Sequence, residues 1–306
     1  MQGSGRKPLW ILGQGGFLGN AIARSANLNG YSVFEANSIP WSRPPQRLGA
    51  LTQLAGAFGE FSAGGRPTLV WAAGADGVGQ REQEGEMESF TDFVRSLSSA
   101  RSLHGARVVL CSSAGGVYSA SKNPPFSIAT PVAASNKYGA NKIAIEAMVK
   151  TELATLFDVH IARITNLYGP WPGPRQGLIN RMCTAAATRK ALQIYVPLDT
   201  VRDYIYVSDA AELLLLESAT AASGLSLSLI GSGENSSVGE VIKTVTNVTR
   251  RKVPISLAYL ESTKLQPRDL RMKSSWQERN HRFAPIPLAE GIKRLFDSLV
   301  TVPRWN

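Results

Sequence analysis

The chain reads Gly13-Gln-Gly-Gly16-Phe-Leu-Gly19 directly after an apolar segment (9–12) and at the start of an amphipathic one (17–28). A glycine-rich turn between a buried strand and a helix presents the free N–H groups of the helix to an anion such as a pyrophosphate. Gly13 permits the tight turn, Gly16 lets the ligand approach the backbone, and Gly19 lets the helix pack closely on the strand. The spacing is G-x-x-G-x-x-G rather than the common G-x-G-x-x-G, and a strand–helix turn without a ligand is the alternative.

Short apolar runs alternate with longer amphipathic segments beyond this turn, which is typical of βαβ units. The further predicted elements are strands at 31–35, 68–72, 107–111, 159–165, 192–196 and 202–207, and helices at 136–157, 178–190 and 288–300. Gly and Pro cluster at 168–177 (YGPWPGPRQG), which indicates a change of lobe. We predict an α/β fold with a Rossmann-like doubly wound parallel sheet in residues 1–168 and a smaller C-terminal substrate lobe in 169–306. A segment near 200–250 is expected to return to the first domain.

Composition and charge restrict the kind of protein that this chain can be. Of its 306 residues, 43% are hydrophobic and 18% are charged, which supports a packed core. No apolar run approaches the roughly 20 residues of a membrane-spanning helix. The start MQGSGRKPLWIL lacks the apolar region of a signal peptide. The two cysteines do not have the spacing of metal ligands. We therefore expect a cytoplasmic protein with neither a membrane segment nor a metal site. The net charge of +10 allows a nucleic-acid binder or a protein with a small anionic substrate, and the scattered basic residues favour the second.

Tyr138-Gly-Ala-Asn-Lys142 places a phenol and an ammonium group one helical turn apart, so both project from one face of the helix predicted at 136–157. A neighbouring cation stabilises a phenolate and lowers the pKa of a tyrosine from about 10, which makes the phenol usable as a general acid or base. Alone, this spacing is more often surface decoration. Here it follows the polar segment that leaves the fourth strand, where such sheets bind ligands, and Ser112 or Ser113 in that segment could donate a hydrogen bond to a substrate oxygen.

Taken together, the motifs resemble those of the extended short-chain dehydrogenase/reductases, in the NAD-dependent epimerase/dehydratase family that acts on nucleotide sugars. The resemblance runs over nearly the whole chain. Its motifs are the glycine turn at 13–19, WAAG at 71–74, SSAGGVY at 112–118, Y-x-x-x-K at 138–142, RITNLYGP at 163–170, RDYIYVSD at 202–209, IGSGE at 230–234 and PLAEGI at 287–292.

The resemblance implies a cofactor site and a substrate site. NAD(P) would be held by Gly13, Gly16, Phe17 and Leu18 at the pyrophosphate and by Ala72, Ala73 and Gly74 along its inner half. Lys142 would hydrogen-bond the nicotinamide ribose and acidify Tyr138, which would move a proton to or from a sugar hydroxyl while the nicotinamide takes or gives hydride. The nucleotide-sugar substrate would be bound by Ser112, Asn166, Asn180, Tyr195 and Arg202, with Asn166 and Arg202 at its diphosphate. An ordinary ion pair with Asp203 or Asp209 is the alternative for Arg202.

The end of the second strand bears on the choice of cofactor. An acidic residue there usually binds the adenosine ribose of NAD, whereas this chain has Asn37, with Arg43 a few residues on. A neutral amide repels a 2′-phosphate less than a carboxylate does, so these two residues slightly favour NADP over NAD. Glu35 could reverse that preference if it turned toward the ribose.

Three departures from the family pattern narrow the expected chemistry. Most relatives carry the catalytic Ser or Thr where this chain has Ala114, so we expect Ser113 to take that role, with Ser112 in reserve. The loop lacks the Asp-Glu pair that resembling 4,6-dehydratases carry, which disfavours dehydration. The loop at 75–86 (ADGVGQREQEGE) and the helix after it, which lacks the typical Asn, are unusual, so the identity of the sugar stays open.

The resulting expectation is an epimerase or a ketoreductase that acts on a nucleotide-linked sugar, with C4 as the favoured carbon. The alternative from another class is a non-catalytic NAD(P)-binding sensor or scaffold on the same fold. The resemblance also implies a homodimer in which helices near 86–103 and 136–157 form a four-helix bundle with their partners.

Overall fold

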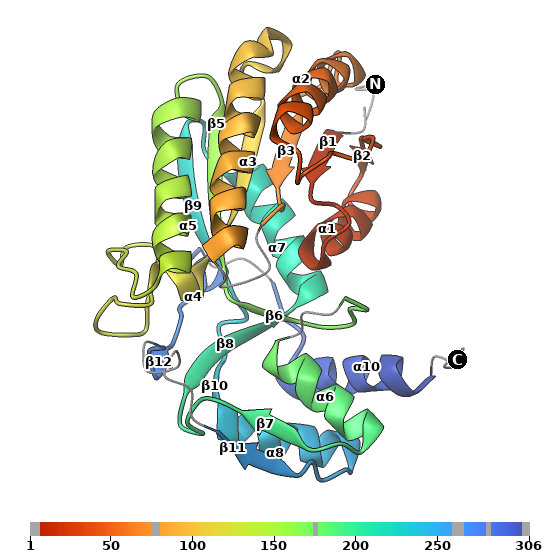
Figure 1. Cartoon of the computed structure of the whole chain (residues 1–306), viewed down its shortest axis with the longest axis vertical. Coiled ribbons are helices and arrows are strands. Elements are labelled where there is room, and N and C mark those ends of the chain that lie inside the picture. The colour runs from red at the N-terminus through yellow and green to blue at the C-terminus, as the bar shows by residue number, and fades with distance from the viewer. Residues whose placement is uncertain (1–6, 75–79, 174–176, 259–265, 280–282, 302–306) are drawn as a thin grey trace.

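The computed structural model describes residues 7–74, 80–173, 177–258, 266–279 and 283–301. A six-stranded, wholly parallel sheet forms the larger part of the molecule, with the strand order β2-β1-β3-β4-β5-β9 (Figure 1). Its strands are β1 (Lys7–Leu12), β2 (Tyr31–Val33), β3 (Thr68–Trp71), β4 (Arg107–Ser113), β5 (Asp158–Ile164) and β9 (Leu225–Ile230). The order reverses direction at β1, as in a doubly wound fold. The predicted fold class is therefore confirmed.

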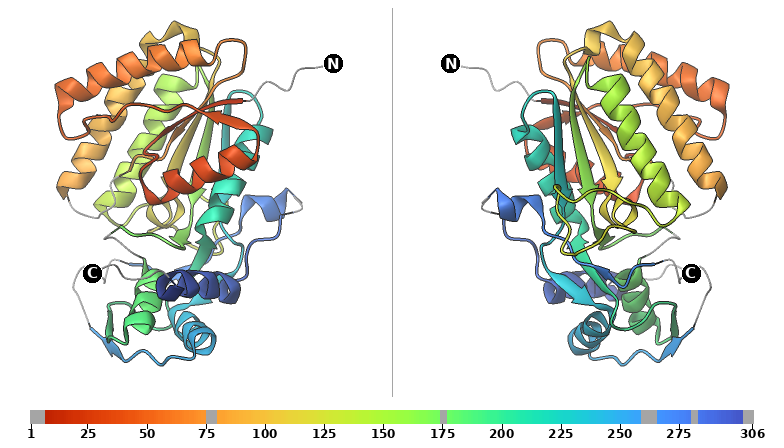
Figure 2. Two further views of the ribbon diagram at one scale, coloured as in Figure 1. Left: turned by 90° about the vertical axis from the view of Figure 1, so that its right-hand side faces the viewer. Right: turned by 90° about the vertical axis from the view of Figure 1, so that its left-hand side faces the viewer.

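Helices cover both faces of this sheet, as the two side views of Figure 2 show. On one face lie α2 (Pro44–Phe61), α3 (Gln80–Ser99) and α5 (Lys137–Met148), and on the other lie α1 (Phe17–Leu28) and α7 (Val207–Thr220). Burial on both faces explains why the central strands are almost continuously apolar, as in the fully buried Leu-Val-Trp of β3.

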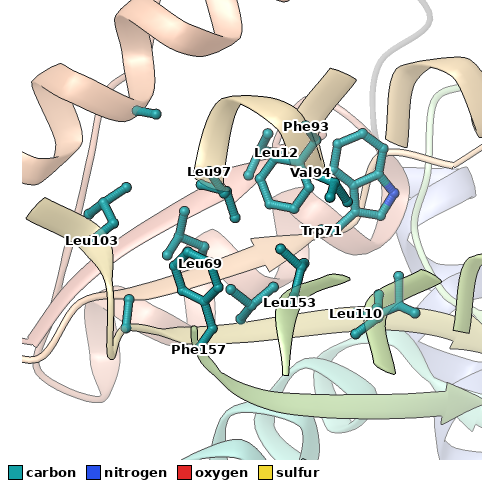
Figure 3. Close-up of a cluster of buried hydrophobic side chains, with 14 of the residues drawn as sticks. Leu12, Leu69, Trp71, Phe93, Val94, Leu97, Leu103, Leu110, Leu153 and Phe157 are labelled. Atoms are coloured by element: carbon teal, nitrogen blue, oxygen red, sulfur yellow. The ribbon is translucent and has the colours of Figure 1, made fainter. Parts of the chain in front are cut away.

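The core on the α2–α3–α5 face is built around Trp71 at the end of β3 (Figure 3). Its ring meets Phe90 edge-on at 5.1 Å and lies 4.9 Å from the Phe93 ring, so β3 is fixed to α3. Aromatic pairs at these separations add about 0.5–1.5 kcal/mol beyond area burial. This packing holds the carboxyl end of β3 in place, where residues 72–74 follow.

The second lobe is smaller and lies at the carboxyl ends of the large sheet's strands (Figure 1). Its strands are β6 (Asn166–Tyr168), β8 (Val201–Tyr206), β10 (Asn235–Ser237) and β12 (Asp269–Leu270), with a separate pair of β7 (Leu192–Ile194) and β11 (Ile255–Leu257). Its helices are α6 (Leu178–Thr188), α8 (Val238–Thr249) and α10 (Leu288–Thr301), which share one apolar cluster. The chain returns to the large sheet as α7 and β9 before it re-enters this lobe. The domain boundaries at 168 and 169 stay a prediction.

Candidate functional site

A cavity of about 730 Å³ opens at the carboxyl ends of β1, β3 and β4, on the side that faces the second lobe. This volume is within the roughly 300–1,000 Å³ of small-molecule sites. Eleven of the residues singled out in the sequence line it: Gly13, Gly16, Phe17, Leu18, Ala72, Ala73, Gly74, Ser112, Ser113, Tyr138 and Lys142. Trp41, Ser42 and Glu86, which the sequence did not single out, line it too.

The glycine turn is shaped for close approach of backbones. Gly13 has a φ of +89°, and a Cβ there would stand 2.6 Å from the Ala73 nitrogen. Gly16 caps α1 with no side chain, and a Cβ on Gly19 would overlap the Gly13 carbonyl oxygen. The first N–H groups of a helix have no partner within it, and here they begin at the cavity wall. The turn therefore fits an anionic group such as a pyrophosphate.

Tyr138 and Lys142 occupy the first turns of α5 and face the same cavity. Asn136 fixes the start of this helix, since its side chain accepts a hydrogen bond of 2.9 Å from the Gly139 N–H. The Lys142 ammonium lies 5.6 Å from the centre of the Tyr138 ring. The spacing of these two residues thus gives the shared face that the sequence predicted.

Lys142 is only 6% exposed, and its ammonium group forms an ion pair with the carboxylate of Glu86 on α3. Burial lowers the pKa of Lys142, but Tyr138 and Glu86 raise it by more, so its pKa lies above the ordinary value. The side chain therefore stays protonated at neutral pH. In the sequence, Glu86 stands in an acidic run and shows no sign that it is buried.

The two serines after β4 have different partners. Ser112 is buried and donates a hydrogen bond of 2.7 Å to Glu146 Oε1. Ser113 caps the short helix α4 (Ala114–Val117) by accepting a hydrogen bond of 3.2 Å from the Gly116 N–H. Because Ser113 is engaged there as an acceptor, its proton can still be donated to a ligand in the cavity.

A buried ion pair supports this serine loop from behind. Arg163 on β5 donates to both carboxylate oxygens of Glu146, at 3.0 and 2.7 Å, and to the Tyr118 hydroxyl at 2.6 Å. Tyr118 in turn donates to the Ser127 carbonyl at 2.8 Å. Glu146 and Arg163 are 2% and 3% exposed, so this network is shielded from water.

A second cavity, of about 470 Å³, lies in the smaller lobe, and Leu167 on β6 lines both cavities. Asn166, Tyr195 and Arg202 line it, as does Arg181, which the sequence analysis did not single out. The Arg202 guanidinium donates to the carbonyls of Val201, Arg268 and Pro267, and these contacts take the place of the alternative ion pair with Asp203 or Asp209.

Three candidate residues do not lie on either cavity wall as the structure describes it. Asn180 is buried, and its side chain bonds both the N–H and the carbonyl of Gly169, at 3.2 and 2.6 Å, so it holds the turn after β6. Asn37 and Arg43 are exposed, and Arg43 is the N-cap residue of α2. The cavity wall there is formed by Trp41 and Ser42 instead.

Known proteins resemble this chain in sequence and in fold. The model of the NAD dependent epimerase/dehydratase family matches residues 9–227. A UDP-glucose 4-epimerase of Azospirillum brasilense is 34% identical over 173 residues, 50% of this chain and 49% of that protein. One of Streptomyces lividans is 31% identical over 169 residues, 50% of this chain and 51% of that protein. The chain thus matches about half the length of these curated relatives.

Solved structures match over nearly the whole length. The UDP-glucose 4-epimerase of Bifidobacterium longum, in complex with NAD+ and UDP, has a TM-score of 0.76 at 18% identity and covers 95% of this chain and 98% of its own. RMD of Pseudomonas aeruginosa, complexed with NADPH, has a TM-score of 0.77 at 16% identity and covers 98% of this chain and 99% of its own. At these identities the likeness shows the fold alone.

Within the described ranges, no helix is long and apolar enough to cross a membrane. Among the same residues, no cluster of three His, Cys, Asp or Glu side chains could hold a metal ion.

Proposed function

Because this chain belongs to the NAD dependent epimerase/dehydratase family, we propose that it transfers hydride at a carbon of a nucleotide-linked sugar, as an epimerase or a ketoreductase, with C4 as the favoured carbon. The observation that carries the proposal is the meeting of Tyr138, Lys142 and Ser113 on one cavity beside the glycine turn of α1. A non-catalytic sensor would not need these three side chains at one site.

The cavity residues fit a nicotinamide dinucleotide. The turn at Gly13 and Gly16 and the start of α1 would hold the pyrophosphate, and Gly74 leaves room beside Lys142, since a Cβ there would stand 3.4 Å from its Nζ. When bound, the nicotinamide would supply a hydride acceptor or donor. Lys142 would donate hydrogen bonds to the adjoining ribose hydroxyls, because its pKa keeps it an ammonium group.

The chain's own residues would handle the proton. Tyr138 would accept the proton of the sugar hydroxyl on oxidation and return it on reduction, next to the positive charge of Lys142. Ser113 would donate a hydrogen bond to the same sugar oxygen, while its own oxygen keeps the bond from Gly116. We assign the catalytic role to Ser113 rather than Ser112, because the Ser112 proton is already given to Glu146.

The nucleotide diphosphate would lie in the second cavity. A guanidinium has five N–H donors, and three of the Arg202 bonds go to backbone carbonyls, which leaves donors for phosphate oxygens. Asn166 and Tyr195 would line the same path, and Arg181 adds a second positive charge to it. The scattered positive charge of the chain suits such a dianionic substrate.

The choice between NAD and NADP and the location of the protein stay proposals. Asn37 and Arg43 favour NADP slightly, because Asn37 is neutral and Arg43, the N-cap residue of α2, is basic, although NAD is the cofactor named in the B. longum complex. We also propose a cytoplasmic protein and a homodimer formed through α3 and α5, which lie side by side on one face of the sheet (Figure 1).

The experiment measures the cofactor released from purified, denatured protein and then the turnover of UDP-glucose and UDP-galactose. Retained NAD with interconversion of the two sugars would support an epimerase. An empty protein that binds NADPH better than NADH and oxidises it with a ketosugar nucleotide would support a ketoreductase. Tyr138→Phe is expected to lower turnover by roughly 10²–10⁴. Unchanged turnover in Tyr138→Phe would refute the mechanism, and cofactor binding without turnover on any nucleotide sugar would favour the sensor.

A further inference from the structure

Glu86 brings a negative charge to the cavity that the proposed proton transfer does not use. It is 5% exposed, lines the cavity from α3, and holds the Lys142 ammonium through Oε1. Its other oxygen, Oε2, is buried and has no hydrogen-bond partner among the described residues. A Cβ on Gly74 would stand 3.4 Å from both Glu86 Oε1 and Lys142 Nζ, so the pair lies directly at the end of β3.

The charge balance around Lys142 depends on this carboxylate. The titratable groups that face its ammonium are Glu86 from α3, Tyr138 from α5 and Cys111 from β4. Burial raises the pKa of the Cys111 thiol to about 12, so the thiol is neutral at working pH. Among these groups, Glu86 is the carboxylate that contacts the ammonium directly, through an ion pair and a hydrogen bond.

The same ion pair restricts the direction of the ammonium group. An ammonium group has three N–H donors on a flexible four-carbon stem, and binding one of them to a carboxylate fixes where the others point. Glu86 approaches from α3, and the Tyr138 ring lies on the α5 side of the ammonium. The remaining donors are thus held within the cavity before any ligand arrives.

We propose that Glu86 is a positioning residue of this site, which acts through Lys142 by fixing its ammonium group and keeping it charged in a buried cavity. This role rests on the proposed function, in which Lys142 serves the cofactor ribose and Tyr138. A buried carboxylate oxygen without a hydrogen-bond partner costs stability, so the Glu86–Lys142 ion pair is unfavourable as a purely structural contact. A site that must hold a charged lysine away from water accounts for the arrangement.

The decisive variant is Glu86→Gln, which keeps the size of the side chain and removes its charge. Glu88→Gln is the matched control, because Glu88 lies two residues on in α3, is 63% exposed and contacts Arg47 instead. The first readout is the ¹³Cε signal of Lys142 in cofactor-free protein with labelled lysine, assigned by its loss in Lys142→Met. Fully buried lysines without a counter-charge can lose about 3–5 pKa units.

In the parent and in Glu88→Gln, the titration midpoint of the Lys142 signal should lie above the ordinary value for lysine. In Glu86→Gln it should titrate at least about one pH unit lower. The alkaline limb of the kcat profile should move down by a similar amount, and Glu86→Asp should restore most of it. A purely structural pair would also lower the Lys142 midpoint when Glu86 is lost, but it would leave the alkaline limb of the kcat profile unchanged. If Glu86→Gln does not fold, Glu86→Met, which also removes the charge, takes its place and must still show the lower Lys142 midpoint.

An unchanged Lys142 titration in a folded Glu86→Gln protein would overturn this inference whatever the activity. Failure of the proposed function looks different, because an active Tyr138→Phe enzyme would refute the reaction while the Lys142 signal still responded to Glu86. The two ideas are thus tested by separate measurements on the same protein.

Discussion

Replacing Glu146 by glutamine would remove the charge that holds Arg163 beneath the serine loop. Glu146 accepts three hydrogen bonds, two from Arg163 and one from Ser112, and all three side chains are buried. The substitution keeps the volume of the side chain, so no cavity is created. Its effect is therefore confined to charge and hydrogen bonding.

The size of the loss in stability depends on the hydrogen bonds that Arg163 retains in the variant. Removal of one partner from a buried ion pair typically costs about 3–5 kcal/mol, because it leaves a charge without compensation. The glutamine carbonyl can still accept from one Arg163 nitrogen, and Arg163 keeps its bond of 2.6 Å to the Tyr118 hydroxyl. We therefore expect the lower end, a loss of about 3 kcal/mol in the free energy of unfolding.

The assay is equilibrium unfolding in urea, followed by tryptophan fluorescence, since Trp10 and Trp71 are fully buried in the core next to this network's sheet. Glu152→Gln is the control, because that side chain is exposed a few residues on from Glu146 and should change stability by less than about 0.5 kcal/mol. Replacing both partners, with Arg163→Met added, should restore part of the loss.

A loss below about 1 kcal/mol in Glu146→Gln would refute the reasoning, as would a double variant whose loss equals the sum of the two single losses. Either result would mean that the two side chains do not act as a unit. It would also remove the argument that Ser112 is committed to this network.

Ser113→Ala is expected to lower turnover by about 10²–10³, as for the loss of one donor to a reacting oxygen. Ser112→Ala should lower turnover far less and cost about 1 kcal/mol of stability. Steady-state kinetics in which Ser112→Ala has the larger effect would exchange the roles of the two serines. Gly19→Ala should abolish cofactor retention and destabilise the fold, because a methyl group would overlap the loop's backbone, while Gly15→Ala has open space and should retain the cofactor. His160 is fully buried between two serine hydroxyls, and burial, with nearby arginines, lowers its pKa to about 3. Because the unfolded chain takes up that proton near pH 6.5, its share of the stability is complete above pH 6.5 and falls by about 1.4 kcal/mol per pH unit toward pH 3. The acid slope of stability should be shallower in His160→Gln, and equal slopes would contradict the assignment.

The sequence predicts the frame of the large sheet because its signals are local. Strands β1, β3, β4 and β5 are short apolar runs, and the glycine turn stands between β1 and α1. The sequence analysis gives no helix over α2, and in the structure Pro44 and Pro45 occupy the first turn of this helix, where a missing N–H does no harm. The three glycines of this helix also weaken its pattern.

The candidate site also contains residues that local sequence motifs predict and residues that they do not. Tyr138, Lys142 and Ser113 belong to motifs that can be recognised from the spacing of their residues in the sequence, and all three line one cavity. Glu86 was missed because its burial depends on a lysine 56 residues away, and an acidic run on a helix usually faces water. The substrate role of Asn180 stays a prediction, because its place in a motif does not reveal that its side chain bonds the Gly169 backbone.

The late return of the chain to the large sheet affects how the protein can be made. Strand β9 pairs with β5 along six residues, and α7 covers α1, yet both follow a long excursion through the second lobe. During synthesis, the first half of the chain must wait with an unpaired strand edge and a bare apolar helix face until residue 230 has emerged. Open edges of this kind attract other chains, so this interval is the period of greatest exposure to aggregation and to chaperones. We therefore expect the two lobes to fold together rather than as independent domains.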